Sequence, residues 1–351
     1  SAVEEKEDET GTETSKEAET ESESTVKSTE TDTEDVETED NSLTETETEV
    51  DTESAELAEE EAPTSGTCGA NLTWKLEDGT LTISGTGAME DYNYYNYNNY
   101  YSPWHDNRDK INQIVVCNGV TSIGNYAFYY CSSLTEITIS DSVTYIGSYA
   151  FSGCTSLTGI AISNSVTRIG NGAFLGCSSL TGVYISSIES WCNIEFYSAP
   201  FSSSNGRGKL YLNGNLVENL IIPNSVTEIK DGAFYGCASI TSVTIPDSVI
   251  SIGGVAFKNC RSLTSVIIPD SVTSIGSRAF EYCYGLTGVY ISSIESWCNI
   301  EFKIGGIGYP EANPLVYARN LYINGNLVNA LTIPDSITQI KYGEFYGCSS
   351  I

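Results

Sequence analysis

The sequence predicts a β-rich α/β solenoid that follows a small β-rich cap and an acidic N-terminal tail. Three observations indicate this architecture. A unit of 23 residues recurs in the second two-thirds of the chain, its apolar residues alternate as in short strands, and the acidic residues gather in the first 62 positions. A fixed step of this size is typical of solenoids, in which each unit buries its apolar side against its neighbours.

Residues 1–65 are predicted to be a disordered acidic tail rich in Thr and Glu. Of the 47 Asp and Glu residues in the chain, 26 lie in Ser1–Ala62, with three lysines and no aromatic residue or cysteine. Such a segment cannot bury enough apolar surface to offset its chain entropy. It could be an extended stalk that carries sugars, or a solubilising spacer without a partner.

The charge balance excludes two classes of partner. Nucleic acids and anionic membrane surfaces require clustered Lys and Arg, and this chain has a net charge of -31. No run of 18 apolar residues occurs, so no membrane insertion is predicted. The chain begins with Ser and shows no leader, so we expect that a leader was removed or that the natural chain is longer.

Residues 66–117 are predicted to form the β-rich capping segment, which includes a loop of alternating Tyr and Asn. Rigid aromatic rings beside adaptable amides are typical of antibody binding loops. The loop could therefore contact a ligand, or it could be a low-complexity loop that lies flat on the first repeat. Its candidate binding residues are Tyr94, Tyr95, Tyr97 and Tyr100.

Residues 118–351 are predicted to form the solenoid, truncated at its C-terminal end. Within one unit, residues 134–139 predict a short strand, residues 143–146 a second extended piece, and residues 147–154 a tight helical turn. Ile351 falls inside a repeat, so we expect the natural chain to continue and this end to fray or associate.

Two longer interruptions of the repeat are copies of each other. The sequence "GVYISSIESWCNIEF" at residues 182–196 recurs unchanged at residues 288–302. Asn213-Gly214 and Asn324-Gly325 lie between β-rich runs, which predicts a two-residue hairpin in each copy. We expect each interruption to be an enlarged turn of the solenoid that carries this hairpin. Trp191 and Trp297 are predicted to fill the core at these enlarged turns.

The cysteines are predicted to be mainly structural. Seven of the eleven share one repeat phase, and stacked side chains in register suit a buried column of thiols better than disulfides. Cys68 and Cys117 flank the cap, and we hypothesise that they form a disulfide, consistent with an extracellular location. There is no C-x-x-C, so no metal site is predicted.

No constellation of residues predicts catalysis, and no cofactor is expected. His105 is the only histidine and lies away from any nucleophile motif. The acid pairs Glu189/Glu195 and Glu295/Glu301 flank a tryptophan, but they recur by duplication and are expected to be solvated. The chain is therefore not predicted to be an enzyme.

The outward strand positions form two columns that differ in variability. One column is uniformly Thr, which strand propensity alone could explain. The other varies from repeat to repeat and carries Tyr184, Ile267 and Tyr290. Variation on a repeated scaffold is how solenoids form recognition surfaces, so we expect these three residues to bind a ligand.

The repeat elements "SVTSIG", "AF" and "GCSSL" resemble the BspA-type leucine-rich repeat array found on bacterial and protist surfaces. The resemblance covers residues 118–351 and implies a secreted or surface-attached protein. It implies an adhesin-like partner, either a protein or a glycan on another cell or host surface, and it contributes no catalytic residues. The alternative is a structural spacer or a non-catalytic region of a larger secreted multidomain protein or enzyme.

Overall fold

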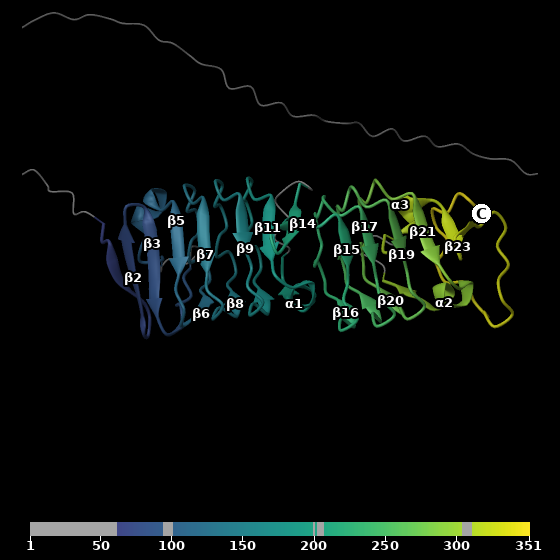
Figure 1. Ribbon diagram of the computed structural model, residues 1–351, viewed down its shortest axis with the longest axis horizontal. Coiled ribbons are helices and arrows are strands. Elements are labelled where there is room, and N and C mark those ends of the chain that lie inside the picture. Colours follow the sequence, from purple (N-terminus) through teal and green to yellow (C-terminus); the bar gives the residue numbers. More distant parts are fainter. Residues whose placement is uncertain (1–61, 94–100, 199–200, 202–206, 304–310) are drawn as a thin grey trace, which may run out of the picture. The chain divides into compact units, whose positions relative to one another are not determined.

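The computed structural model describes residues 62–93, 101–198, 201, 207–303 and 311–351. Nearly all of the predicted tail and the four loop tyrosines lie outside these residues, so those predictions stay untested. Over the described residues the predicted solenoid is confirmed, with parallel strands from successive repeats side by side (Figure 1). The sequence prediction placed Ser65 in the tail, but Ser65 is the first residue of strand β1.

The cap joins the solenoid through one five-stranded sheet. Its first three strands are antiparallel, and β3 then pairs in parallel with β5, which pairs in parallel with β7 of the first repeat. The cap therefore covers the first solenoid strand by continuing its sheet, which removes one open sheet edge. The strands are β1 (Ser65–Gly69), β2 (Leu72–Glu77), β3 (Thr80–Gly85), β5 (Gln113–Val116) and β7 (Glu136–Ile139).

Two further sheets continue the strand face, the side of the coil that carries the outward columns. Their orders are β14-β13-β11-β9 and β15-β17-β19-β21-β23-β24, parallel except for the hairpin strands β14 and β24. The first sheet contains β9 (Gly159–Ala161), β11 (Gly182–Ile185), β13 (Lys209–Leu212) and β14 (Asn215–Leu216). The second contains β15 (Asn219–Ile221), β17 (Ser242–Thr244), β19 (Ser265–Ile267), β21 (Gly288–Ile291), β23 (Leu321–Ile323) and β24 (Asn326–Leu327).

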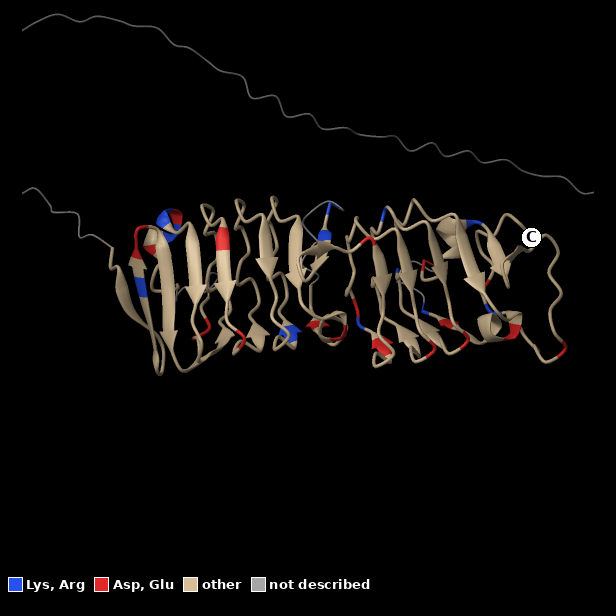
Figure 2. Ribbon diagram, in the orientation of Figure 1, with Lys and Arg blue, Asp and Glu red and all other residues tan. Residues whose placement is uncertain are grey.

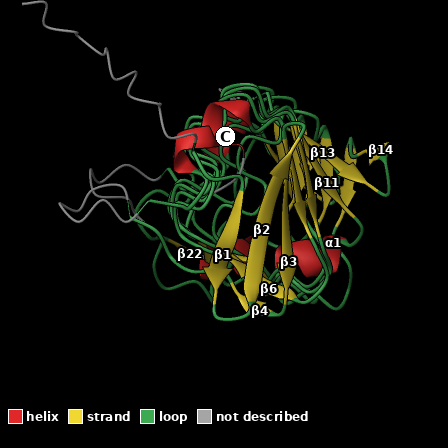
Figure 3. Cartoon of the chain, turned by 90° about the vertical axis from the view of Figure 1, so that its left-hand side faces the viewer, coloured by secondary structure: helices red, strands yellow, loops and turns green. Residues whose placement is uncertain are grey.

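Shorter strands line a second side of the coil, as the end-on view shows (Figure 3). They are the second extended pieces predicted from the repeat, and they form the parallel sheets β12-β10-β8-β6-β4 and β16-β18-β20-β22. The first sheet contains β4 (Gly87–Ala88), β6 (Val120–Ile123), β8 (Tyr145–Ile146), β10 (Arg168–Ile169) and β12 (Glu195–Phe196). The second contains β16 (Glu228–Ile229), β18 (Ser251–Ile252), β20 (Ser274–Ile275) and β22 (Glu301–Phe302).

The third side of each repeat consists of turns, so the predicted helical turn is not a regular helix. Residues 148–153 form consecutive turns, and no helix is assigned within the 23-residue units among the described residues. The helices lie in the cap and in the enlarged turns instead. They are the 3-10 helix η1 (His105–Lys110) and the α-helices α1 (Ile188–Cys192), α2 (Ile294–Asn299) and α3 (Leu315–Ala318).

The core consists of identical side chains stacked one repeat apart. The repeat Val, Ala and Phe residues are buried, and neighbouring Phe rings stack with centroids 5.2–5.5 Å apart. The backbone links the same positions, since the Phe N–H of one repeat donates to the Ala carbonyl of the next at 2.8 Å. Each repeat therefore satisfies buried backbone groups of its neighbour, as solenoid stacking requires.

The enlarged turns divide the solenoid into runs of regular repeats, here called blocks. Where a block begins, a tryptophan replaces this backbone bond. The indole Nε1 groups of Trp104 and Trp191 donate to the carbonyls of Ala127 and Ala233, both at 2.8 Å. Trp297 does the same for Glu344, at 3.1 Å. The buried tryptophans thus confirm the prediction that they fill the core, and they also act as hydrogen-bond donors to the next block.

The cysteine column consists of free thiols, of which six are buried, as predicted, and the last, Cys348, is half-buried. Within a block, each thiol donates to the Phe carbonyl of the preceding repeat, as in Cys260 to Phe234 at 3.1 Å. Burial raises the pKa of the Cys131 and Cys283 thiols to about 12. These cysteines are therefore neutral hydrogen-bond donors in the core and poor nucleophiles.

The hypothesised disulfide between Cys68 and Cys117 is wrong, because both cysteines are free. Cys68 lies on β1 and Cys117 follows β5, with β2 and β3 between them in the sheet. Three strand steps of about 4.8 Å separate the two positions by roughly 14 Å. A disulfide needs Cα atoms within about 7 Å, so the cap would have to rearrange to form it.

Replacing Trp191 by Phe should lower the free energy of unfolding by about 1–3 kcal/mol, because the buried Ala233 carbonyl loses its donor. Urea unfolding of the full chain measures the loss. The matched control is Trp74→Phe, since the buried Trp74 indole N–H has no hydrogen-bond partner to lose. Equal losses in the two variants would contradict the assigned role of the indole donor.

Stability should fall as the pH rises from about 9 towards 12. An unfolded thiol ionises near its ordinary pKa of 9.0, whereas the buried Cys131 thiol has a pKa of about 12. The unfolded state therefore binds fewer protons in this window, and each such thiol lowers the free energy of unfolding by about 1.4 kcal/mol per pH unit. Urea unfolding at pH 8, 9 and 10 measures the slope. The Cys131→Val variant should show a shallower slope, and an unchanged slope would reject this origin.

Candidate functional site

The varying column on the strand face is the candidate functional site. Strand register places Tyr184 between Ala161 and Tyr211 in the first of the two sheets. In the second sheet, register aligns the residues Ile221, Thr244, Ile267, Tyr290 and Tyr322 across successive strands. Ile221 is 67% exposed, Ile267 53% and Tyr184 42%, so the column presents large apolar side chains to solvent.

Two pairs of stacked tyrosines dominate this column. The rings of Tyr184 and Tyr211 are stacked with centroids 4.7 Å apart and planes 16° apart. The rings of Tyr290 and Tyr322 repeat this arrangement at 4.5 Å and 11°. Each pair joins the first strand of an enlarged turn to the strand of its hairpin. The duplication in the sequence is therefore also a duplication of an aromatic surface.

Glycines on the same face give the rings room to lie across the sheet. A Cβ atom on Gly288 would lie 2.9 Å from Cε2 of Tyr322 and 3.0 Å from Cε2 of Tyr290. At the first copy, a Cβ on Gly182 would lie 3.1 Å from Cε2 of Tyr184, and one on Gly159 of the neighbouring strand 2.9 Å from the same atom. Because these approaches are closer than side-chain carbons tolerate, the glycines set the position of the tyrosine pairs.

The two predicted hairpins are present and add a leucine to each pair. Asn213 and Gly214 have φ of 49° and 81°, and Asn324 and Gly325 have 48° and 79°. Positive φ at both turn residues is what a two-residue hairpin of this type requires. Strand pairing then sets Leu216 opposite Tyr211 and Leu327 opposite Tyr322. These leucines, 40% and 42% exposed, extend both aromatic surfaces.

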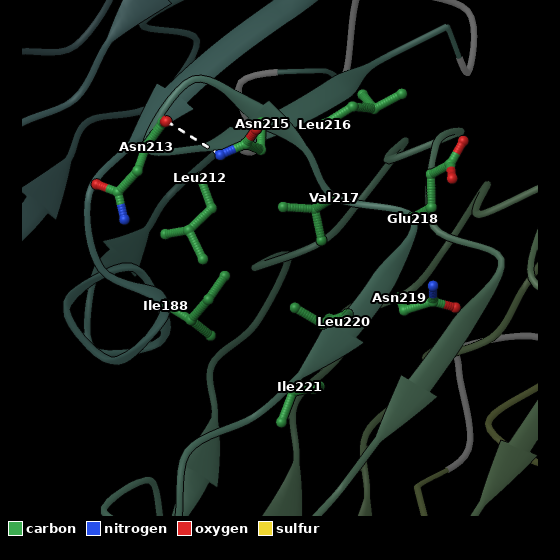
Figure 4. A pocket seen from close by; sticks show the side chains of 10 residues that line it. All are labelled: Ile188, Leu212, Asn213, Asn215, Leu216, Val217, Glu218, Asn219, Leu220 and Ile221. Carbon is green, nitrogen blue, oxygen red and sulfur yellow. Dashed lines mark hydrogen bonds between the residues drawn. The ribbon is translucent and has the colours of Figure 1, made fainter.

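The first hairpin also encloses a pocket of about 410 Å³, here named the hairpin pocket. The side chains of Ile188, Leu212, Val217 and Leu220 converge on it from α1, β13, the end of the hairpin and β15 (Figure 4). Its remaining lining residues are Asn213, Asn215, Leu216, Glu218, Asn219 and Ile221. Its volume falls within the range of small-ligand pockets, about 300–1,000 Å³.

The uniform Thr column has a structural role instead. The Oγ1 of Thr264 donates to the carbonyl of Thr241 at 3.1 Å, and Thr287 donates to Thr264 at 3.0 Å. The same bond occurs in the first solenoid strand, from Thr135 to Asn112 at 3.0 Å. These threonines bond their repeats to the preceding ones, which strand propensity alone does not require.

The structure thus places Tyr184 in the first sheet of the strand face, and Ile267 and Tyr290 side by side in register in the second. Tyr94, Tyr95, Tyr97 and Tyr100 lie outside the described residues. The sequence prediction missed Tyr211, Tyr322 and the hairpin leucines. The signal was available, since "LYLNGNL" from Leu210 and "LYINGNL" from Leu321 carry the same Tyr and Leu.

The remaining chemical candidates do not form a reactive site. His105 stacks on Tyr101 with centroids 4.2 Å apart, and burial lowers its pKa. Glu189 and Glu195 are both exposed, as the sequence predicted. Over the part of the chain that the structure describes, no group of three His, Cys, Asp or Glu residues could hold a metal ion. Over the same residues, no helix has the length and apolarity needed to cross a bilayer.

Replacing Gly288 by Ala should displace the rings of Tyr290 and Tyr322 and reduce their stacking. Because the exposed ring ends can move, the free energy of unfolding should change by less than about 1 kcal/mol. Near-ultraviolet circular dichroism and the ring-proton shifts of both tyrosines measure the displacement. Ser265→Ala, at the register position next to Gly288, is the control. Unchanged ring signals in Gly288→Ala would refute the positioning role.

Several solved structures are similar to this chain. The solved structure of a leucine-rich repeat protein from Eubacterium ventriosum is similar over 81% of this chain and 95% of its own, with 24% identity and a TM-score of 0.39. A leucine rich cell surface protein from Faecalibacterium prausnitzii matches over 83% and 94%, with 21% identity and a TM-score of 0.33. The pneumococcal vaccine antigen PcpA matches over 77% and 91%, with 13% identity and a TM-score of 0.31.

A search of the curated proteins finds no match. A profile of the BspA type leucine rich repeat region, in contrast, matches six copies at residues 104–210, 208–304 and 318–351. These matches cover well over half of the chain, and they include Trp104 and the first enlarged turn. The chain therefore belongs to the BspA type leucine rich repeat family.

Proposed function

We propose that this protein is a non-catalytic interaction module, secreted or held at a cell surface, that binds a protein or glycan on another cell or host surface. Membership of the family suggests a surface repeat protein that mediates interactions. The observation that carries the proposal is the exposed column with its duplicated tyrosine pairs. Aromatic rings with hydroxyl groups bury large areas and keep a polar end for hydrogen bonding.

The strand face indicates the chemistry of the ligand. Lys209 is the only charged residue in the strands of the two sheets that carry the column, and Figure 2 shows these strands almost without charge. The ligand is therefore held by apolar, aromatic and neutral hydrogen-bonding contacts. Such contacts are little affected by salt, in contrast to ion pairs at a surface.

The scaffold also favours binding by a preformed surface. The column lies on parallel strands whose side chains stand in register, and the inward residues of those strands are buried. The tyrosine rings are supported by stacking and by the glycines beneath them. Binding then orders few additional side chains, which lowers the entropic cost of association.

The two tyrosine pairs face the same way on one strand face. Five strand steps of about 4.8 Å separate them, so they lie at least about 24 Å apart. A ligand that repeats the same epitope could contact both pairs, and the second contact would then be intramolecular. Repetitive surface proteins and polysaccharides have this property, which is why both classes remain within the proposal.

Replacing Tyr184, Ile267 and Tyr290 together by Ser should reduce retention of the ligand at least about tenfold, or ~1.4 kcal/mol. A glycan array and a pull-down from a surface-protein extract, both with the full chain, supply the ligand and the readout.

The matched control replaces Tyr197, Ile250 and Tyr284 by Ser. These residues are 63%, 48% and 67% exposed and lie outside the two strand-face sheets. Equal retention of every ligand by both triple variants would reject the strand-face site. Failure of the unaltered chain to retain any ligand would favour the alternative function, a structural spacer.

A further inference from the structure

The ladder of the strand face is interrupted at the first hairpin. β13 pairs with β14, but β14 ends its sheet, and β15 begins the next sheet and pairs only with β17. Only Val217 and Glu218 separate β14 from β15 along the chain. β15 is therefore an edge strand in the middle of the strand face, beside the hairpin pocket.

The open edge of β15 presents a defined set of backbone groups. The carbonyl of Glu218 accepts from Thr241, and the N–H of Ile222 donates to Thr244, so these groups face β17. Alternation along a parallel ladder turns the N–H and C=O groups of Asn219 and Ile221 to the opposite side. Among the described residues, no strand pairs with that side. An extended backbone is the partner whose donors and acceptors match this spacing.

The hairpin pocket supplies specificity next to this edge. Ile188, Val217 and Leu220 are at most 8% exposed and form its apolar wall, while Ile221 lies on its outer rim at 67% exposed. A strand that pairs with β15 directs alternate side chains inward and outward. Its inward side chain would enter the pocket, and its outward side chain would contact Ile221.

The charge of the pocket selects between peptides. Glu218 is the only charged residue among the ten that line it, and its side chain is exposed at the rim. No Lys or Arg lines the pocket to neutralise this carboxylate. A cationic side chain on the bound strand would complement it, whereas an acidic one would be repelled.

We propose that the hairpin pocket binds an extended peptide segment of a partner protein, which adds as a strand to the open edge of β15. An apolar side chain of the peptide fills the pocket between Ile188, Val217 and Leu220, and a neighbouring Lys or Arg pairs with Glu218. This site uses the backbone edge of β15 and borders the strand-face column at Ile221, but it does not involve Tyr184, Ile267 or Tyr290.

The test uses the full chain and labelled peptides in fluorescence polarisation. The probe is acetyl-KTVTVTVK-amide, with acetyl-ETVTVTVE-amide and the proline-interrupted acetyl-KTVPVPVK-amide as comparisons. The lysine peptide should bind at least about tenfold more tightly than either of the others. Hydrogen exchange should then show protection of the Asn219 and Ile221 amides, about elevenfold at a peptide concentration of ten times Kd. Absence of binding, or binding without protection of these amides, would overturn the proposal.

Two variants of this edge separate backbone pairing from charge. Ile221→Pro removes one donor on the open side of β15 and leaves the bonds to β17, since proline is compatible with an edge strand. It should weaken the lysine peptide at least about tenfold. Glu218→Lys should reverse the preference towards the glutamate peptide, and it tests the site even where the proline variant fails to fold.

The controls distinguish this site from the strand-face site. Glu136→Lys makes the same charge change on β7, away from the hairpin, and should leave the preference for the lysine peptide unchanged. The Tyr184/Ile267/Tyr290 serine variant should bind the peptide as the unaltered chain does. A reversed preference in Glu136→Lys would assign the selectivity to net charge and reject the pocket.

Discussion

The hydrogen bonds between the inner turns of successive repeats are the constraint on which this structure depends. Each repeat turns its chain tightly around a buried Phe, and the Ala carbonyl next to that Phe lies in the core. The Phe N–H of the preceding repeat satisfies this carbonyl at 2.8 Å, and the Cys thiol of the following repeat satisfies the Phe carbonyl. Because buried backbone groups cannot be left unpaired, every repeat requires a neighbour in register.

This constraint explains why tryptophans occur where the array is interrupted. At an enlarged turn, the carbonyl of the next block accepts from an indole instead of a Phe N–H. The indole of Trp191 or Trp297 donates to that carbonyl and fills the enlarged core in one residue. Trp104 does the same between the cap and the first repeat, and its ring also stacks on Phe128. The cap and the enlarged turns therefore begin a block in the same way, with an indole N–H that donates to the first inner-turn carbonyl.

The interruptions are also the source of the candidate binding surfaces. In a regular repeat, 23 residues are only enough to complete one turn of the coil. The extra residues of an enlarged turn form a hairpin, and the hairpin adds a tyrosine, a leucine and, in the first copy, a pocket beside an open strand. The regular repeats supply rigidity, while the enlarged turns supply the features that differ from the repeat and can distinguish one ligand from another.

The repeat spacing of the sequence by itself determined the stacked columns, the two sets of strands, the hairpins and the buried tryptophans and thiols. Periodic apolar side chains allow few alternatives, because each must be buried by its copy one repeat away. The sequence also pointed to Tyr184, Ile267 and Tyr290, since variation on a repeated surface is visible without coordinates.

Only the tertiary structure decided which residues meet across those columns. The separation of Cys68 from Cys117 depends on which strands of the cap join one sheet, because β2 and β3 lie between β1 and β5 while β4 belongs to another sheet. The pairing of Tyr184 with Tyr211, the glycines beneath the rings and the open edge of β15 depend on register and on where a sheet ends. Periodicity says which side of a strand a residue occupies. It does not say which strand lies beside it, because that is set by hydrogen bonding between segments far apart in the chain.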